Sequence, residues 1–307
     1  MILSGKRPPS PDTCTKSWAG PARQHQWNSK KFPWTPAASI HSQQPSLGRE
    51  GPVSQSLAQY PRKLWRLGLF LAAALRGLWL HRKLPRNATR LQCAEWLHQT
   101  CLGGLRALHV EVEVEGRLPA GGLIVSNHVS YLDILAYSTA LPCVFVSKAE
   151  VQQWPIFGPY ARWSGSVFVR RHDRGDAARA NVSVGEILKH RVPVVLFPEG
   201  TTTDGQRVLR FHSTMLQPAI DSAVLVTPCA IRYELEDGDG AREVCWWGDM
   251  KLLPHVWNLL GKKSIRARIF FGEPMTATAD RKVLSAALHA QVVQLHDERH
   301  TSNQALA

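Results

Sequence analysis

The chain has 307 residues, enough for one large domain or two small ones with a substantial buried core. Its formal net charge of +13 comes entirely from residues 1–90, which hold 15 Lys or Arg against Asp12 and Glu50, whereas residues 91–307 hold 22 basic and 22 acidic residues. This asymmetry argues against a basic nucleic-acid-binding domain. It favours an N-terminal part that is attracted to an anionic surface such as lipid headgroups.

Cysteine spacing excludes two further classes of protein. There is no C-x-x-C pair and no Cys-plus-His spacing typical of zinc sites, so neither a disulfide framework nor a structural metal is predicted. A reducing environment that faces the cytoplasm fits best. The six cysteines are Cys14, Cys93, Cys101, Cys143, Cys229 and Cys245.

The N-terminal third divides into a tail and two expected helices. Residues 1–60 are rich in Pro, Ser, Gln and basic residues, which predicts a disordered basic tail. Leu64–Leu80 is apolar and helical in pattern but is interrupted by two arginines, so it is shorter than the about 20 apolar residues that a transmembrane span needs. A second amphipathic helix is expected over Thr89–Leu102, ending at Gly103-Gly104.

Tryptophans and basic residues mark both ends of the first expected helix. Trp65 and Trp79 lie near its ends, and arginines and lysines flank it, as in helices that lie at a membrane interface. We therefore predict a membrane-associated helical hairpin over residues 61–107. A helix that packs onto the globular domain is the alternative.

Strands and helices alternate after this hairpin. The pattern predicts an α/β catalytic domain over residues 108–300, with helices that cover a central, largely parallel or mixed sheet. Helices are expected at Asp176–His190 and Asp280–His296. The expected strands are His109–Val114, Leu123–Ser126, Cys143–Ser147, Ser166–Val169, Val194–Phe197, Ala223–Ile231 and Ile265–Phe271.

A histidine and an aspartate follow the second of these strands, five positions apart. His128 comes where the strand ends, and a helix is expected to start between Ser130 and Asp133, with Ser130 as its N-cap. The two side chains can then face each other across one strand-to-helix turn, which suits a carboxylate that orients a general-base imidazole. By themselves the pair also fits an ordinary solvated helix start.

Two more polar clusters follow expected strands. Arg170 and Arg171 end one strand, and an arginine that enters a cleft there favours contact with a phosphate or carboxylate. A solvated basic corner that pairs with Asp173 or Asp176 is the alternative. Phe197–Thr203 follows another strand, where Glu199 offers a carboxylate for substrate hydroxyls and Gly200 and Thr201 offer backbone amides and a hydroxyl. Ligands of α/β sheets bind beyond the carboxyl ends of strands, and all three clusters lie at such ends.

These clusters resemble the motifs of the glycerolipid acyltransferase family, and they are most similar to those of the 1-acylglycerol-3-phosphate acyltransferases. The resemblance covers roughly residues 108–275, with the motifs in the family's order and spacing. The motifs are N-H-x-S-x-x-D at Asn127, His128, Ser130 and Asp133; Gly165, Phe168, Arg170 and Arg171; F-P-E-G-T at Phe197–Thr201; and Val226-Thr227-Pro228.

One stretch departs from the family pattern. After the third motif the family shows Phe-Lys followed closely by Gly, whereas this chain has Arg210-Phe211-His212-Ser213-Thr214. This departure puts the acceptor headgroup in question more than the reaction.

The resemblance implies acyl transfer from acyl-CoA or acyl-carrier protein to the sn-2 hydroxyl of 1-acylglycerol-3-phosphate, which forms phosphatidic acid. It gives His128 the role of general base and Asp133 that of its orienting group, and it assigns the acceptor phosphate to Arg170 and Arg171. Glu199, Gly200 and Thr201 would complete the substrate site. No metal or cofactor is expected, the partners are membrane lipids and not nucleic acid, and the expected location is the cytoplasmic face of the inner membrane.

Other functions fit the residues less well. A lyso-ornithine lipid or lysophosphatidylcholine is an alternative acceptor. A serine hydrolase would need a G-x-S-x-G elbow, which is absent from the sequence, and a metal-dependent phosphatase would need more ligands than His128, Asp133 and Glu199. A peripheral tether protein would leave the three strand-end clusters unexplained.

Overall fold

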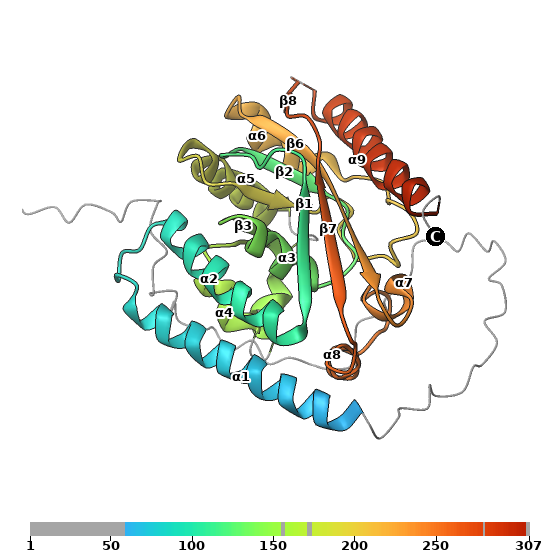
Figure 1. The fold of residues 1–307 in the computed structure, drawn as a ribbon. Coiled ribbons are helices and arrows are strands. Elements are labelled where there is room, and N and C mark those ends of the chain that lie inside the picture. The colour runs from blue at the N-terminus through green and yellow to red at the C-terminus, as the bar shows by residue number, and fades with distance from the viewer. Residues whose placement is uncertain (1–58, 155–156, 171–173, 279, 305–307) are drawn as a thin grey trace, which may run out of the picture.

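The computed structural model describes residues 59–154, 157–170, 174–278 and 280–304, and these form one mixed sheet between two layers of helices (Figure 1). The eight strands follow the order β1-β7-β6-β2-β5-β3-β4, with β8 paired to β6. Neighbours are parallel except for β6 with β7 and β6 with β8. The strands are β1 (Val110–Glu115), β2 (Leu123–Ser126), β3 (Val144–Lys148), β4 (Val167–Val169), β5 (Val194–Leu196), β6 (Leu225–Leu235), β7 (Ile265–Phe271) and β8 (Met275–Thr276).

Helices cover both faces of this sheet, as the alternating pattern predicted. α2, α3 and α8 share a core with one face, and α5, α6 and α9 share a second core with the other face. The helices are α1 (Tyr60–Lys83), α2 (Arg90–Leu108), α3 (Leu132–Ala140), α4 (Phe157–Trp163), α5 (Arg174–Lys189), α6 (Gln217–Asp221), α7 (Gly240–Glu243), α8 (Leu252–Leu259) and α9 (Arg281–Gln304), with 3₁₀ turns η2 (Ala149–Gln153) and η3 (Ser213–Leu216).

Strand β2 lies at the centre and is buried on both faces. Ile124 packs into the core beneath α2 and α3, whereas Leu123 and Val125 pack into the core beneath α5 and α9. Successive side chains of a strand point to opposite faces, so a continuous apolar run is what a central strand requires. This explains why Leu123–Ser126 could be predicted with its observed bounds.

The end of α2 differs from its predicted position. A capping box joins Thr89 and Gln92 at its start, but the helix continues through Gly103-Gly104 to Leu108 and ends at His109, which has a positive φ of 57°. The two glycines serve packing rather than termination. A Cβ on Gly103 would lie 3.4 Å from the Cβ of Ala73 in α1.

Helix α1 packs along α2 and is attached to the end of α8. At Gly77 of α1 a Cβ would meet the methyl group of Thr100 at 2.6 Å, so the two helices approach closely there. At its other end, Arg66 donates to the carbonyl oxygens of Leu260 and Lys263 at 3.5 and 3.0 Å, just after α8 ends. Positive side chains at a helix C-terminus interact favourably with its dipole and its free carbonyl groups.

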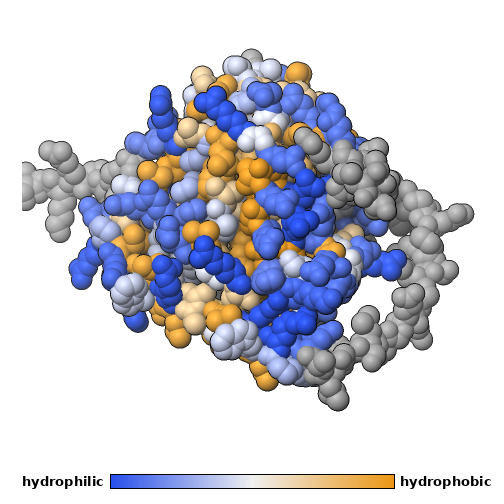
Figure 2. All heavy atoms as spheres, viewed as in Figure 1, coloured by the Kyte–Doolittle hydropathy of each residue, from blue (hydrophilic) through white to orange (hydrophobic). Residues whose placement is uncertain are grey.

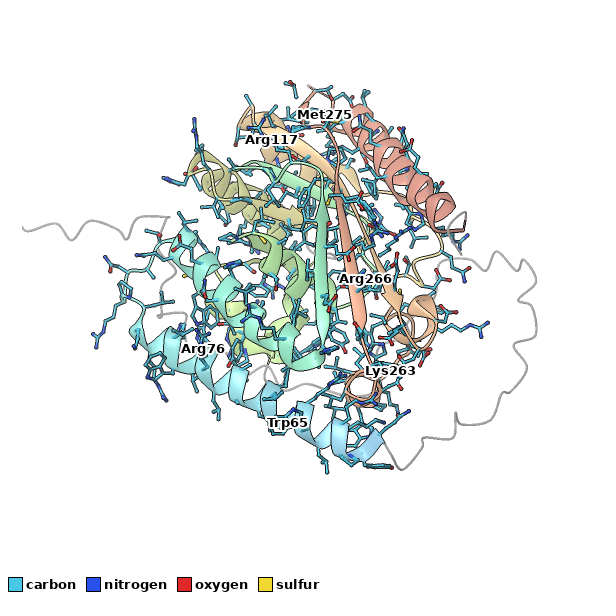
Figure 3. All side chains as sticks on the ribbon, in the orientation of Figure 1. Trp65, Arg76, Arg117, Lys263, Arg266 and Met275 are labelled. Carbon is cyan, nitrogen blue, oxygen red and sulfur yellow. The ribbon has the colours of Figure 1, made fainter. Side chains whose placement is uncertain are left out.

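The remaining side of α1 is exposed and largely apolar. Leu75 is 67% exposed and Trp65 69%, with Leu64, Leu71 and Trp79 also exposed. Hydrophobic spheres appear along the α1 edge in Figure 2, and Figure 3 labels Trp65 and Arg76 on this helix. In the described ranges no helix combines the length and the apolar character that crossing a bilayer requires.

Oppositely charged side chains cover one side of β1 and β7. Arg266 lies 2.8 Å from Glu113, and Arg268 lies 2.5 Å from Glu115 and 3.4 Å from Glu234 of β6. Arg266, labelled in Figure 3, is 49% exposed at its side chain, so this is a solvated face. The pairs connect neighbouring strands across the sheet.

The strand directions place the three polar clusters at one edge. β2, β5, β3 and β4 are mutually parallel neighbours, so their carboxyl ends, Ser126, Leu196, Lys148 and Val169, face the same way. The residues that follow them form the candidate site.

Candidate active site

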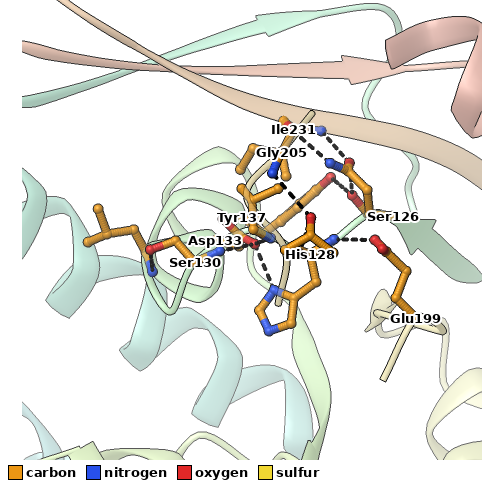
Figure 4. A network of polar contacts seen from close by, with 12 residues as sticks. Ser126, His128, Ser130, Asp133, Tyr137, Glu199, Gly205 and Ile231 are labelled. Carbon is orange, nitrogen blue, oxygen red and sulfur yellow. Dashed lines mark hydrogen bonds and ion pairs between the residues drawn. The ribbon is translucent and has the colours of Figure 1, made fainter. Parts of the chain in front are cut away.

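The loop after β2 is fixed to the neighbouring strand before His128 is reached. The side-chain nitrogen of Asn127, Nδ2, donates to the carbonyl oxygen of Ile231 at 3.0 Å. The side-chain oxygen, Oδ1, accepts the backbone N–H of Ile231 at 2.8 Å. Asn127 therefore continues the contact of β2 with β6 through a side chain, and the start of the loop has a defined position (Figure 4).

His128 and Asp133 make the contact that their spacing predicted. His128 Nδ1 lies 2.7 Å from Asp133 Oδ2, and the Asp133 side chain has no solvent exposure. The same oxygen accepts the backbone N–H groups of Val129 at 2.8 Å and Ser130 at 3.1 Å. A buried carboxylate needs such donors, because its charge is otherwise costly to desolvate.

The start of α3 corrects the prediction of Ser130 as N-cap. The cap position is Tyr131, with no side-chain cap, and the helix begins at Leu132. Asp133, in the first turn, takes the free loop amides instead. Asp133 thus contacts both the turn and the imidazole, so one residue fixes the conformation of the loop and the orientation of the histidine ring.

The imidazole is held on a flat aromatic surface and is partly open to solvent. It stacks on Phe197 with ring centroids 4.2 Å apart and an angle of 13° between the planes. Its side chain is 20% exposed, and Figure 4 shows the Nε2 edge directed away from Asp133. Among the described residues no serine or cysteine side chain hydrogen-bonds to His128. The arrangement presents a free ring nitrogen beside a buried carboxylate, which suits proton transfer to or from a ligand.

Glu199, which the sequence suggested as an acceptor for substrate hydroxyls, accepts two backbone N–H groups in the structure. Its Oε1 accepts the backbone N–H of His128 at 2.8 Å, and its Oε2 accepts that of Leu209 at 2.8 Å. The side chain is 4% exposed, and burial, reinforced by the charge of Asp133, raises its pKa to about 7 against the opposing effect of the two amides. Glu199 therefore holds the backbone of the loop that follows β2 in place at His128.

The segment after Glu199 supports the same loop from the other side. The backbone N–H of Thr203 donates to the His128 carbonyl oxygen at 3.0 Å. Gly200 has a φ of 77°, which favours glycine, and it is buried, whereas Thr201 is exposed. Of the three residues predicted here, Thr201 alone presents its side chain to solvent.

Arg170, one of the two predicted arginines, lies exposed just after β4. The Arg170 side chain is 64% exposed and its Nε lies 3.5 Å from Asp176 Oδ2, as in the alternative of a solvated, paired corner. β4, which Arg170 follows, is separated from β2 by β3 and β5. Arg171 lies outside the described residues.

The stretch that departs from the family pattern lies against the third motif. The backbone N–H of His212 donates to the carbonyl oxygen of Pro198 at 2.9 Å. Phe211 is buried, whereas Arg210 and His212 are exposed. This stretch therefore lies next to the edge of the sheet that carries the candidate site.

A tyrosine that the sequence did not single out completes the site. The hydroxyl group of Tyr233 donates to Asp133 Oδ1 at 2.8 Å from strand β6. Nothing in the spacing reveals this contact, because it depends on β6 lying beside β2. Within residues 59–154, 157–170, 174–278 and 280–304, no three His, Cys, Asp or Glu side chains gather in a way that could hold a metal ion.

Known proteins that are similar in sequence are acyltransferases. The family model described as Acyltransferase matches residues 109–232. The chain is 34% identical over 240 residues to a lyso-ornithine lipid O-acyltransferase of Rhizobium meliloti, covering 72% of this chain and 79% of the relative. It is 35% identical over 173 residues to a 1-acyl-sn-glycerol-3-phosphate acyltransferase of Neisseria gonorrhoeae, covering 55% of this chain and 67% of the relative.

A solved structure has the same fold. The crystal structure of the 1-acyl-sn-glycerophosphate acyltransferase PlsC from Thermotoga maritima aligns with a TM-score of 0.59 at 20% identity, covering 79% of this chain and 96% of that one. The solved structure shows the fold, and the sequence relatives show that the chain belongs to the acyltransferase family.

Proposed function

We propose that this chain transfers a fatty acyl group from an acyl thioester to the sn-2 hydroxyl of 1-acylglycerol-3-phosphate, forming phosphatidic acid for phospholipid biosynthesis. The observation that carries the proposal is the 2.7 Å contact of His128 with Asp133 at the carboxyl edge of the sheet. Acyl-CoA and acyl-carrier protein present the same thioester, and either serves as donor in this scheme.

The dyad supplies general-base catalysis. His128 Nε2 takes the proton of the acceptor hydroxyl as its oxygen attacks the thioester carbonyl carbon, and Asp133 stabilises the imidazolium. The C–S bond then breaks, and the leaving thiolate takes up the proton from the imidazolium. General-base catalysis typically increases the reaction rate by about 10²–10⁴-fold. The remaining acceleration comes from holding both lipidic substrates in position.

The acceptor phosphate is assigned to Arg170 and Arg171. Arg170 would exchange its exposed contact with Asp176 for the phosphate, and such an exchange is inexpensive because exposed ion pairs are weak. Gly200 and Thr201 lie beside the loop and contribute to the glycerol end of the site. Glu199 acts on the substrate indirectly, through the backbone of His128.

A lyso-ornithine lipid is the second candidate acceptor. The Rhizobium meliloti relative and one from Pseudomonas aeruginosa, 35% identical over 201 residues, are named for that acceptor. The stretch Arg210–Thr214, which departs from the family pattern, lies against the third motif and offers different side chains to a headgroup.

The membrane is proposed as the place of reaction. The exposed apolar side of α1, with arginines and lysines near it, suits an interfacial helix on an anionic bilayer. We propose that the hairpin of residues 61–107 rests on the membrane through the exposed side of α1, on the cytoplasmic face of the inner membrane.

The test is an assay of purified protein with labelled acyl-CoA and acyl-carrier protein against lysophosphatidic acid, lyso-ornithine lipid and lysophosphatidylcholine. Product is expected with lysophosphatidic acid in the wild type and is expected to fall by about 10²–10⁴-fold in His128→Ala. His190→Ala, an exposed histidine after α5, is the control and should keep full activity. Undiminished transfer by the His128 variant would refute His128 as the general base. Exclusive use of lyso-ornithine lipid would refute lysophosphatidic acid as the acceptor.

A further inference from the structure

A buried tyrosine forms a hydrogen bond with the aspartate of the His128–Asp133 dyad. Tyr233 belongs to β6 and lies 100 positions after Asp133 in the chain, yet its hydroxyl group donates to Asp133 Oδ1 at 2.8 Å. The residue is 7% exposed, so the hydroxyl has little access to water. No motif of the sequence includes this residue.

The two oxygens of Asp133 have separate duties. Oδ2 accepts three contacts, from His128 Nδ1 and from the backbone N–H groups of Val129 and Ser130. Oδ1 accepts Tyr233, which is its one donor among the described residues. A carboxylate can rotate about its bond to Cβ, and the donor on Oδ1 acts with the three contacts on Oδ2 against that rotation.

We propose that Tyr233 is a positioning residue of the acyl transfer, which fixes the rotation of the Asp133 carboxylate so that Oδ2 stays in line with His128 Nδ1–H. The inference rests on the proposed function of the dyad. It extends that function to a residue from a different strand, which holds the orienting group and touches neither substrate.

The strand that carries Tyr233 is itself held at a fixed distance from the loop. Asn127 bonds both backbone groups of Ile231, two positions before Tyr233 on the same side of β6. Burial, followed by the charge of Asp133, raises the pKa of Tyr233 well above its ordinary value. The hydroxyl group thus remains a donor at every pH at which an imidazole base works.

The experiment compares Tyr233→Phe with a matched control, Tyr137→Phe. Tyr137 is also buried, and its hydroxyl group lies within hydrogen-bond distance of Ser126 Oγ at 2.7 Å and Cys229 Sγ at 3.0 Å, with no such contact to Asp133. Both variants keep the aromatic ring and lose one buried hydroxyl group. A merely structural role would therefore affect both in the same way.

We expect Tyr233→Phe to lower kcat by about 10–100-fold, the usual range for a hydrogen bond to a charged group, while KM for donor and acceptor stays within about twofold. The acidic limb of its pH–rate profile should move to higher pH, because a carboxylate with one donor fewer holds the imidazolium proton more tightly. Tyr137→Phe should keep both kcat and the profile, with a similar loss of thermal stability.

A readout without turnover separates this inference from the proposed function. The proton shared by His128 and Asp133 is expected to give a downfield ¹H NMR signal, which should shift in Tyr233→Phe and stay in place in Tyr137→Phe. A signal that is unmoved in Tyr233→Phe, or a kcat that falls equally in both tyrosine variants, would overturn the positioning role. Wild-type protein without transferase activity would instead refute the proposed function, and the NMR comparison would still decide the role of Tyr233.

Discussion

Glu199 is a buried acid that contacts the backbone of the loop after β2. Both of its oxygens accept backbone N–H groups, yet burial raises its pKa to about 7. A carboxyl group whose pKa is raised on folding contributes stability that is complete below its unfolded value of about 4.3 and is lost as the pH rises through the folded value. The stability that Glu199 contributes is therefore lost between about pH 4.5 and pH 7.

We predict that Glu199→Gln removes this pH dependence. Relative to wild type, the free energy of unfolding of the variant should improve by about 2–3 kcal/mol between pH 4.5 and 8, on top of a constant loss from one missing acceptor. Denaturant unfolding at several pH values measures it. Glu95→Gln, at an exposed position of α2, is the control and should follow wild type. Parallel curves for Glu199→Gln and wild type would contradict the prediction.

The residues that could be predicted from the sequence are those whose contacts are local. His128 and Asp133 are five positions apart in one strand-to-helix turn, so their contact followed from spacing. Glu199 reaches the backbone of His128 across 71 positions, and Tyr233 reaches Asp133 across 100. Such contacts depend on strand order, which composition and periodicity do not encode, and for this reason the backbone contacts of Glu199 and the contact of Tyr233 were not predicted.

At the scale of elements, apolar periodicity predicted the strands better than the ends of the helices. β2 and β7 have the predicted bounds because both are buried, unbroken apolar or alternating runs. α2 runs past its predicted end because Gly103 faces α1, a use of glycine that only the packed structure reveals. The two-residue strand β8 is too short to give any pattern.

Helix α1 provides a prediction about the membrane. Leu75→Glu places a charge on its exposed apolar side and should weaken binding to anionic vesicles by about tenfold or more, because a buried leucine contributes about 1.5–3 kcal/mol. Vesicle sedimentation measures this effect. Val182→Glu is the control, since Val182 is 68% exposed, against 67% for Leu75, but lies on α5. Equal losses in both variants would argue against α1 as the membrane surface.

At the scale of the whole molecule, the charge and the chemistry occupy different parts of the chain. The contacts of the dyad come from residues 127–233, whereas residues 1–58 carry seven basic and two acidic residues. Deleting residues 1–58 should therefore leave kcat on detergent-dispersed lysolipid within about twofold. Affinity for anionic vesicles at low salt should fall severalfold, because basic residues near such a surface contribute about 1 kcal/mol each. A large loss of kcat would assign a catalytic part to this segment.

The position of β6 beside β2 also sets an order of events during synthesis. β2 is complete at Ser126, but its partner β6 begins at Leu225, and the contacts of Asn127 and Asp133 with β6 lie at Ile231 and Tyr233. When His128 and Asp133 have left the ribosome, about a hundred more residues must therefore emerge before the site can be complete. Long-range pairing of this kind forms slowly, so the edge of β2 that pairs with β6 stays unpaired during this interval. A chaperone that covers β2 would act then.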